Sequence, residues 1–284
     1  MLKTLENPKD PLEMKNKIEL LENKIASYGR VIIGFSAGVD STLVAFTANK
    51  VLGKNALIIL ARTETIIDED IELARELAKK YKFNYEEIEY NELEIENYAS
   101  NPINRCYYCK SELYNRLFEI SAERNILYVL DGANADDLGD YRPGRVAAEE
   151  NKIRSPLIEC GFTKQDVRDA AEFYGIPNYD KPSAPCLSSR IPYGTFINSE
   201  SINMIARAEK YIRSKGFKNV RVRHFNHTAK VEVDTYDVDR IKSIYDEVEH
   251  ELKSIGYKIV EIDEEGFKSG KLNRTIIAQV ENAE

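Results

Sequence analysis

The segment GFSAGVDST, residues 34–42, has the composition of a phosphate-binding loop. Its small residues would let backbone N–H groups approach a phosphate, and the amino end of the helix expected after it adds about half a positive charge. Ser36 and Ser41 can donate hydroxyl hydrogen bonds to phosphate oxygens, while Asp40 can orient the loop or help to hold Mg²⁺. The Walker A and GxGxxG patterns are absent. An ordinary strand-to-helix turn remains the alternative.

Three of the four cysteines stand at positions that suit a metal centre. Cys106 and Cys109 form the sequence CYYC just ahead of an expected helix, and Cys186 lies in a proline-rich turn. Thiols at positions i and i+3 can converge on one centre, and a distant loop can supply a third ligand. The alternatives are a structural zinc site that includes Cys160, or thiols that are simply buried or exposed. We interpret Cys160 as structural.

Arg221 and Arg223 alternate in the sequence VRVR, so on a strand both side chains would point to the same face. Paired guanidinium groups suit a phosphate or a carboxylate, because their planar N–H groups can donate two parallel hydrogen bonds. A solvated strand face with no ligand is the alternative interpretation.

These residues are set in an alternation of strand and helix patterns. Strand patterns occur at 31–35, 56–62, 85–91 and 128–132, and all but 85–91 are apolar runs typical of buried parallel strands. Helical patterns occur at 13–29, 41–52, 69–82, 111–125 and 161–175, the last with Thr163 as its expected N-cap. This order predicts an α/β fold with a doubly wound parallel sheet.

A proline-rich stretch at 179–194 ends this alternation, because three prolines within about eleven residues exclude a regular helix or central strand. Beyond it, the patterns predict helices at 199–216 and 238–256 and strands at 219–225, 229–234 and 257–263. We therefore expect two domains: residues 1–182, and a smaller C-terminal α/β domain, residues 183–284, for substrate binding and oligomerisation.

Composition narrows the classes of partner. The chain has 284 residues, of which 43% are hydrophobic, with a net charge of −8. Proteins that bind nucleic acid usually carry a basic face, so the acidic balance disfavours tRNA or DNA as a substrate. No apolar run has the length of a membrane span or a signal peptide. We expect a cytoplasmic protein whose cysteines form no disulfide framework.

The sequence SAGVDS resembles the SGGxDS motif of PP-loop ATP pyrophosphatases, with Ala37 in place of the second glycine. A left-handed backbone at this alanine would cost about 1 kcal/mol or more. The segments DGANADDLGDYRPGRVAAEE, SPLIECGFTKQDVR, SSRIPYG and VRVRHFNHTAKVEV extend the resemblance. Together they are similar to the LarE family, the sulfur transferases of nickel-pincer nucleotide assembly, over residues 31–270.

The resemblance implies an ATP-dependent reaction in two halves. A carboxylate of a pyridinium mononucleotide, which bears two carboxylates at ring positions three and five, would attack ATP and release pyrophosphate. Mg²⁺ and the loop would stabilise the departing group. Sulfur would then expel AMP and leave a thiocarboxylate. ATP is consumed because AMP is a better leaving group than a carboxylate oxygen.

Site residues follow from the resemblance where the motifs match. The residues implied to hold the ATP phosphates are Ser36, Ala37, Gly38, Asp40 and Ser41. Those implied to bind the substrate are Arg221, Arg223, Ser189 and Arg190. Glu209 and Glu232 would lie near the arginines as candidate ligands of a divalent metal ion. Asp40 and Cys186 are the expected catalytic residues.

The resemblance also offers two sources of sulfur. One branch of the family sacrifices a single cysteine in the region of Cys186, leaving dehydroalanine, and lacks the CxxC pair. The branch that this chain resembles holds a 4Fe–4S cluster, here by Cys106, Cys109 and Cys186. Three ligands leave one iron open for hydrosulfide, which the solvent or a sulfur carrier would provide. We expect a homo-oligomer.

Other functions compete with this interpretation. A cluster-dependent tRNA thiolase would use the same three cysteines, but the net charge of −8 and the lack of an added basic domain disfavour it. A nucleotide sensor would bind ATP or AMP without releasing pyrophosphate. Amide-forming synthetases of NAD or GMP share the loop, yet the three cysteines have no role in them.

Overall fold

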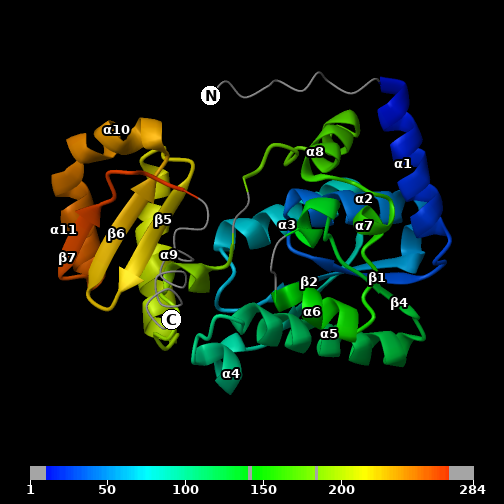
Figure 1. The fold of residues 1–284 in the computed structure, drawn as a ribbon, viewed down its shortest axis with the longest axis horizontal. Coiled ribbons are helices and arrows are strands. Elements are labelled where there is room, and N and C mark those ends of the chain that lie inside the picture. The colour runs from blue at the N-terminus through cyan, green and yellow to red at the C-terminus, as the bar shows by residue number, and fades with distance from the viewer. Residues whose placement is uncertain (1–10, 140–142, 183–184, 269–284) are drawn as a thin grey trace, which may run out of the picture. The chain divides into compact units, whose positions relative to one another are not determined.

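The computed structural model describes residues 11–139, 143–182 and 185–268 (Figure 1). Two predicted features fall partly outside these ranges: the letters DYR of the segment DGANADDLGDYRPGRVAAEE, at 140–142, and positions 183–184 at the expected domain boundary. The described residues form two compact units. The first unit draws on residues 1–63, 68–90 and 106–184, and the second on 64–67, 91–105 and 185–284.

The first unit contains a parallel sheet of four strands in the order β3-β2-β1-β4. Its strands are β1 (Val31–Phe35), β2 (Ala56–Arg62), β3 (Asn84–Glu89) and β4 (Tyr128–Leu130). The chain thus extends the sheet from β1 to β2 and β3, and then returns to place β4 on the other side of β1. This topology confirms the predicted α/β fold.

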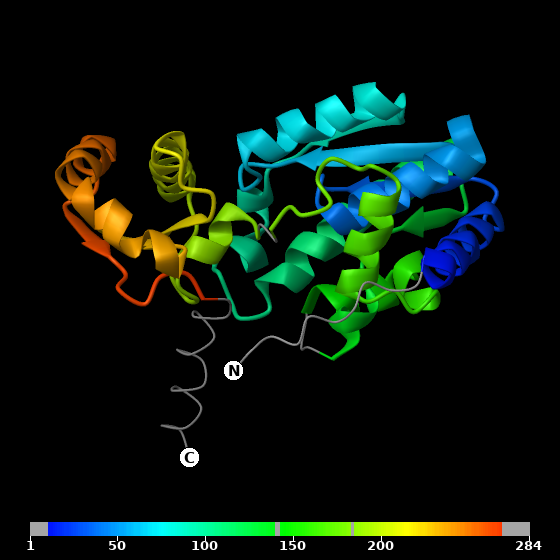
Figure 2. The same cartoon turned by 90° about the horizontal axis from the view of Figure 1, so that it is seen from above.

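Helices cover both faces of this sheet (Figures 1 and 2). On one face α2 (Val39–Leu52) packs on β1 and β2, with α1 (Pro11–Ala26) and α8 (Lys164–Phe173) against it. On the other face α5 (Arg105–Arg124) and α6 (Pro143–Glu150) bury apolar side chains on the strands. The remaining helices are α3 (Asp68–Tyr81) and the short α7 (Pro156–Glu159), with single 3₁₀ turns at Gly53–Asn55 and Ala135–Leu138.

Two details of the helices bear on the predictions. Thr163 caps α8 as expected, since it accepts a hydrogen bond from the backbone of Asp166, whose side chain bonds back to Thr163. Cys106 and Cys109, however, lie within the first turns of α5 rather than ahead of it. Tyr and Cys are weak helix formers, so the pattern placed the start of the helix too late.

The second unit is a three-stranded sheet in the order β5-β6-β7. β5 (Val220–Phe225) and β6 (Thr228–Val233) are antiparallel, and β7 (Ile259–Ile262) runs parallel to β6. The longer helices are α9 (Ser199–Ser214), α10 (Val238–Ser243) and α11 (Tyr245–Ile255). The shorter elements are α4 (Glu96–Ala99) and the 3₁₀ turns Glu92–Glu94, Leu187–Arg190 and Thr235–Asp237.

One predicted helix of the second unit is wrong in its length. The pattern at 238–256 divides at Ile244, whose φ of −114° and ψ of 22° are not helical. The break lets Ile241 of α10 and Val248 of α11 both enter the core that covers the sheet. In the part of the chain that the structure describes, no helix is long and apolar enough to cross a membrane.

Segments distant in sequence also join the second unit. Thr65 accepts a hydrogen bond through its carbonyl from the N–H of Leu187, at 2.9 Å. The Asn101 amide donates to the carbonyls of Pro192 and Thr195, at 2.8 and 3.0 Å. These contacts fix the proline-rich stretch, in which little regular secondary structure forms.

Candidate functional site

The predicted phosphate loop lies at the carboxyl end of β1 and leads into α2. The order β3-β2-β1-β4 reverses between β1 and β4, and open parallel sheets bind ligands at the carboxyl ends of strands where such a reversal occurs. Residues 131–134, which follow β4, touch the loop closely: a Cβ atom placed on Gly132 would lie 2.7 Å from the Ser41 nitrogen. The sheet therefore brings two polar segments together at its ligand-binding edge.

The loop itself is compact and held by its own hydroxyl groups. Ala37 is fully buried and adopts a left-handed backbone with φ of 53°. Gly38 is the N-cap residue of α2, and its carbonyl accepts a hydrogen bond from the Ser41 hydroxyl at 3.1 Å. The Ser36 and Ser41 hydroxyl oxygens are 3.1 Å apart. The two hydroxyls thus lie together at the amino end of α2, an arrangement that suits an anion.

Asp40 is the acidic member of the loop, and other segments neutralise it. The Lys164 ammonium, at the start of α8, forms an ion pair with the Asp40 carboxylate. The Asn134 amide donates to the other carboxylate oxygen at 3.1 Å. Neither partner was predicted from the sequence, although both lie in segments that carry the family resemblance, DGAN and TKQDVR. The loop therefore has a cation within reach of any phosphate that it binds.

The CxxC pair lies near the end of β4 in the same unit. Tyr114 of α5 donates to Asp131, the residue after β4, at 3.4 Å. Although desolvation favours the neutral amine, the charges of Tyr114, Cys109 and Asp131 raise the pKa of Lys110 above its ordinary value. Cys106 is exposed and Cys109 is half-buried. Two accessible thiols thus lie within four residues of a lysine on whose pKa the charge of Asp131, just after β4, acts.

The other cysteines lie elsewhere. Cys186 is half-buried, belongs to the second unit, and precedes the 3₁₀ turn Leu187–Arg190. Cys160 is buried at the end of α7, and burial raises the pKa of its thiol. None of the four forms a disulfide bond. Over residues 11–139, 143–182 and 185–268, the structure brings no three Cys, His, Asp or Glu side chains together as a metal site, so the three-cysteine cluster stays a prediction.

Buried ion pairs hold two of the predicted substrate-binding arginines in the second unit. The Arg190 guanidinium binds the Glu209 carboxylate through two hydrogen bonds of 2.7 and 2.9 Å, with side chains only 3% and 0% exposed. Arg213 also donates to Glu209, at 3.1 Å. Arg223 binds Glu232 at 3.0 Å and donates to the carbonyl of Ser189 at 2.8 Å. A divalent metal ion at either glutamate would have to displace an arginine.

Arg221 differs from these arginines. Its guanidinium stacks 4.2 Å from the ring centre of Phe267, and no described carboxylate forms an ion pair with it. Burial, together with the positive charges of Arg190 and Arg223, lowers the pKa of Arg221 to about 10. Four arginines, counting Arg213, therefore surround two glutamates, and the cluster has an excess of positive charge. An anion beside Arg221 would offset this charge.

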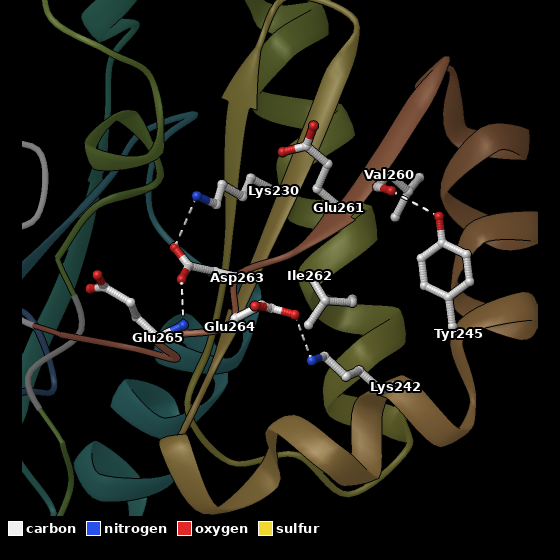
Figure 3. Close-up of a pocket in the computed structure, with 9 residues that line it drawn as sticks. All are labelled: Lys230, Lys242, Tyr245, Val260, Glu261, Ile262, Asp263, Glu264 and Glu265. Carbon is white, nitrogen blue, oxygen red and sulfur yellow. Dashed lines mark hydrogen bonds and ion pairs between the residues drawn. The ribbon is translucent and has the colours of Figure 1, made fainter.

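A surface pocket in the second unit contains none of the predicted site residues (Figure 3). It lies between β7 and the junction of α10 with α11. Both of its lysines already pair with carboxylates of the pocket: Lys230 with Asp263 at 3.3 Å, and Lys242 with Glu264 at 2.9 Å. The Tyr245 hydroxyl donates to the carbonyl of Val260 at 2.9 Å. The pocket therefore does not compete with the phosphate loop as a functional site.

Comparisons with known proteins agree with the position of the loop. The family described as NAD synthase matches residues 13–106, which include it. Pyridinium-3,5-bisthiocarboxylic acid mononucleotide synthase of Lactiplantibacillus plantarum is 38% identical over 248 residues, which cover 87% of this chain and 90% of that protein. Uncharacterized proteins of Synechocystis sp. and Methanocaldococcus jannaschii are 40% and 29% identical, over 93% and 91% of this chain and 99% and 97% of their own.

Proposed function

The protein belongs to the LarE family of ATP-using, adenylating sulfurtransferases, and we propose that it makes a thiocarboxylate on a pyridinium mononucleotide. The name of its relative from Lactiplantibacillus plantarum supports this product. The observation that carries the proposal is the loop of residues 36–41, in which two hydroxyls lie 3.1 Å apart at the amino end of α2, a setting that suits an anion.

In the first half-reaction a substrate carboxylate oxygen attacks the α-phosphorus of ATP. The new O–P bond forms as the bond to the bridging oxygen breaks, and pyrophosphate leaves with the electron pair. The loop N–H groups and the Ser36 and Ser41 hydroxyls stabilise the departing charge. Lys164 adds a positive charge when it exchanges Asp40 for a phosphate oxygen. Asp40 would then be available to hold Mg²⁺, which neutralises phosphate charge when bound.

In the second half-reaction a sulfur nucleophile attacks the acyl carbon and expels AMP. With hydrosulfide the balance is acyl-adenylate plus HS⁻ to thiocarboxylate, AMP and a proton. Cys106, Cys109 and Cys186 would hold a 4Fe–4S cluster, which when bound would hold hydrosulfide for this step. The accessible CxxC pair beside Lys110, at the carboxyl end of β4, supports this assignment.

The second unit would bind the phosphate of the mononucleotide. Arg221 supplies the guanidinium, since Arg190 and Arg223 are already held by glutamates. Their charge nevertheless contributes to the local potential, which favours an anion over a neutral ligand. The arginines also contact the segment that follows Cys186, because the carbonyl of Ser189 accepts a hydrogen bond from Arg223.

The proposal is tested by measuring pyrophosphate released from ATP with and without pyridinium-3,5-biscarboxylic acid mononucleotide. Release should depend on the mononucleotide and should be lost in Ser41→Ala. Ser214→Ala is the matched control, because that hydroxyl donates to a helix carbonyl on an exposed surface of the second unit. Equal rates in the two variants, or release of ADP and phosphate instead, would show that the loop has another role.

A further inference from the structure

The left-handed backbone of Ala37 is held from outside the loop. An L residue adopts this conformation only at a cost, which glycine does not incur. The Asn178 amide donates to the Ala37 carbonyl at 2.9 Å, and the Lys181 ammonium donates to the same oxygen at 3.3 Å. Both donors come from the segment that follows α8 in the first unit. Neither was predicted from the sequence as a site residue.

The two donors are themselves fixed. Asn178 is only 5% exposed and also donates to the Thr42 hydroxyl at 3.1 Å. That hydroxyl donates in turn to the carbonyl of Gly38 at 2.8 Å. Lys181 forms an ion pair with Asp70 of α3 at 2.7 Å. The Oδ1 atom of Asn178 is buried without a hydrogen-bond partner among the described residues, so the contribution of this side chain comes from its N–H groups.

The two hydrogen bonds to the Ala37 carbonyl also set the direction of the Gly38 N–H, which belongs to the same peptide group. In a trans peptide the C=O and the following N–H point in opposite directions. Because Asn178 and Lys181 hold the Ala37 carbonyl, the Gly38 N–H is directed away from them, toward Ser36, whose hydroxyl it reaches at 3.4 Å. If this peptide flipped, a carbonyl oxygen would face the anion site and repel a phosphate.

We infer that Asn178 and Lys181 are positioning residues for ATP, which hold the 37–38 peptide with its N–H toward the phosphates. The inference rests on the proposed function of the loop. It adds that the segment after α8, together with Asp70 of α3, keeps the loop ready for ATP before the nucleotide binds.

The test is a double-mutant cycle with ATP binding to the full-length protein measured by calorimetry. Asn178→Ala should weaken ATP binding about fivefold or more, the effect of losing one or two hydrogen bonds. In an Ala37→Gly background the same substitution should cost less than about twofold, because glycine adopts the left-handed conformation without support. Asn84→Ala is the matched control, since that amide donates to a backbone carbonyl at the opposite edge of the sheet.

Each outcome decides the inference. If Asn178→Ala weakens ATP binding by the same factor with Ala37 and with Ala37→Gly, the inference is overturned. The loss of affinity would then come from a general effect on the fold, which glycine at position 37 would not rescue. If Asn178→Ala does not fold, Lys181→Met tests the same carbonyl from a partly exposed side chain. If the parent binds ATP, and Asn178→Ala and Lys181→Met bind it with the same affinity as the parent, the inference is refuted but the proposed function is not. Failure of the parent to bind ATP refutes the proposed function as well.

Discussion

Replacing Gly132 with alanine should disable the phosphate loop. Gly132 follows β4, and no room exists for a methyl group between it and the backbone of the loop. The added Cβ would lie 2.7 Å from the Ser41 nitrogen, 2.9 Å from the Ser41 Cα and 3.0 Å from the carbonyl carbon of Asp40. Carbon atoms pack at about 3.5–4.0 Å, so the two backbones would have to separate by roughly 1 Å. Neither segment offers a flexible side chain that could yield instead.

This separation sets the expected magnitude. Overpacking of a core costs about 1–3 kcal/mol of unfolding free energy. A displacement of roughly 1 Å at a reacting site can cost on the order of a hundredfold in rate. We therefore expect Gly132→Ala to lower the unfolding temperature by several degrees and to reduce mononucleotide-dependent pyrophosphate release by roughly ten- to a hundredfold.

The assay compares Gly132→Ala with Gly139→Ala. Gly139 has φ of −87°, and a Cβ placed there meets nothing nearer than the Asp136 carbonyl at 4.0 Å. Both variants add the same methyl group to the same connecting segment, but only the first reaches the loop. Pyrophosphate release by Gly132→Ala at the rate of Gly139→Ala would refute the placement of the ATP phosphates at this edge of the sheet.

Three further predictions concern the second unit and the cysteines. Glu209→Gln should lower the free energy of unfolding by roughly 3–5 kcal/mol in a urea titration, because it leaves the buried charge of Arg190 unpaired; an unchanged midpoint would contradict this. Arg221→Ala should weaken binding of the mononucleotide but not of ATP in calorimetry. Alanine at any of the three cluster cysteines should abolish bound iron and sulfur transfer while pyrophosphate release continues; if sulfur is instead taken from the protein, only Cys186 is needed and the chain loses the mass of one hydrogen sulfide.

The sequence was sufficient for features that depend on local pattern. The β-branched run VIIGF is apolar throughout because β1 is buried on both faces by helices, which is the condition that makes a parallel strand recognisable. The loop after it was recognisable because its small residues serve one purpose, close approach to an anion. The family resemblance rests on several such segments spread along the chain.

Ion pairs and helix breaks that depend on contacts between distant segments could not be predicted from the sequence. The Lys164 side chain neutralises Asp40 across 124 positions of sequence, and nothing in either segment indicates the other. Glu209 and Glu232 were expected as candidate metal ligands from the family resemblance alone; the structure shows them bound to Arg190 and Arg223. The break of the expected helix at Ile244 follows from packing on the sheet, which periodicity cannot express.

In the proposed reaction, ATP is spent to replace an oxygen of a substrate carboxylate with sulfur. Mass spectrometry of the mononucleotide tests this after incubation of anaerobically prepared protein with Mg-ATP and hydrosulfide, with AMP and pyrophosphate measured in the same sample. We expect a product in which oxygen is exchanged for sulfur, with one AMP and one pyrophosphate formed for each sulfur incorporated. Consumption of ATP without sulfur in the mononucleotide, or sulfur incorporation without AMP, would contradict it.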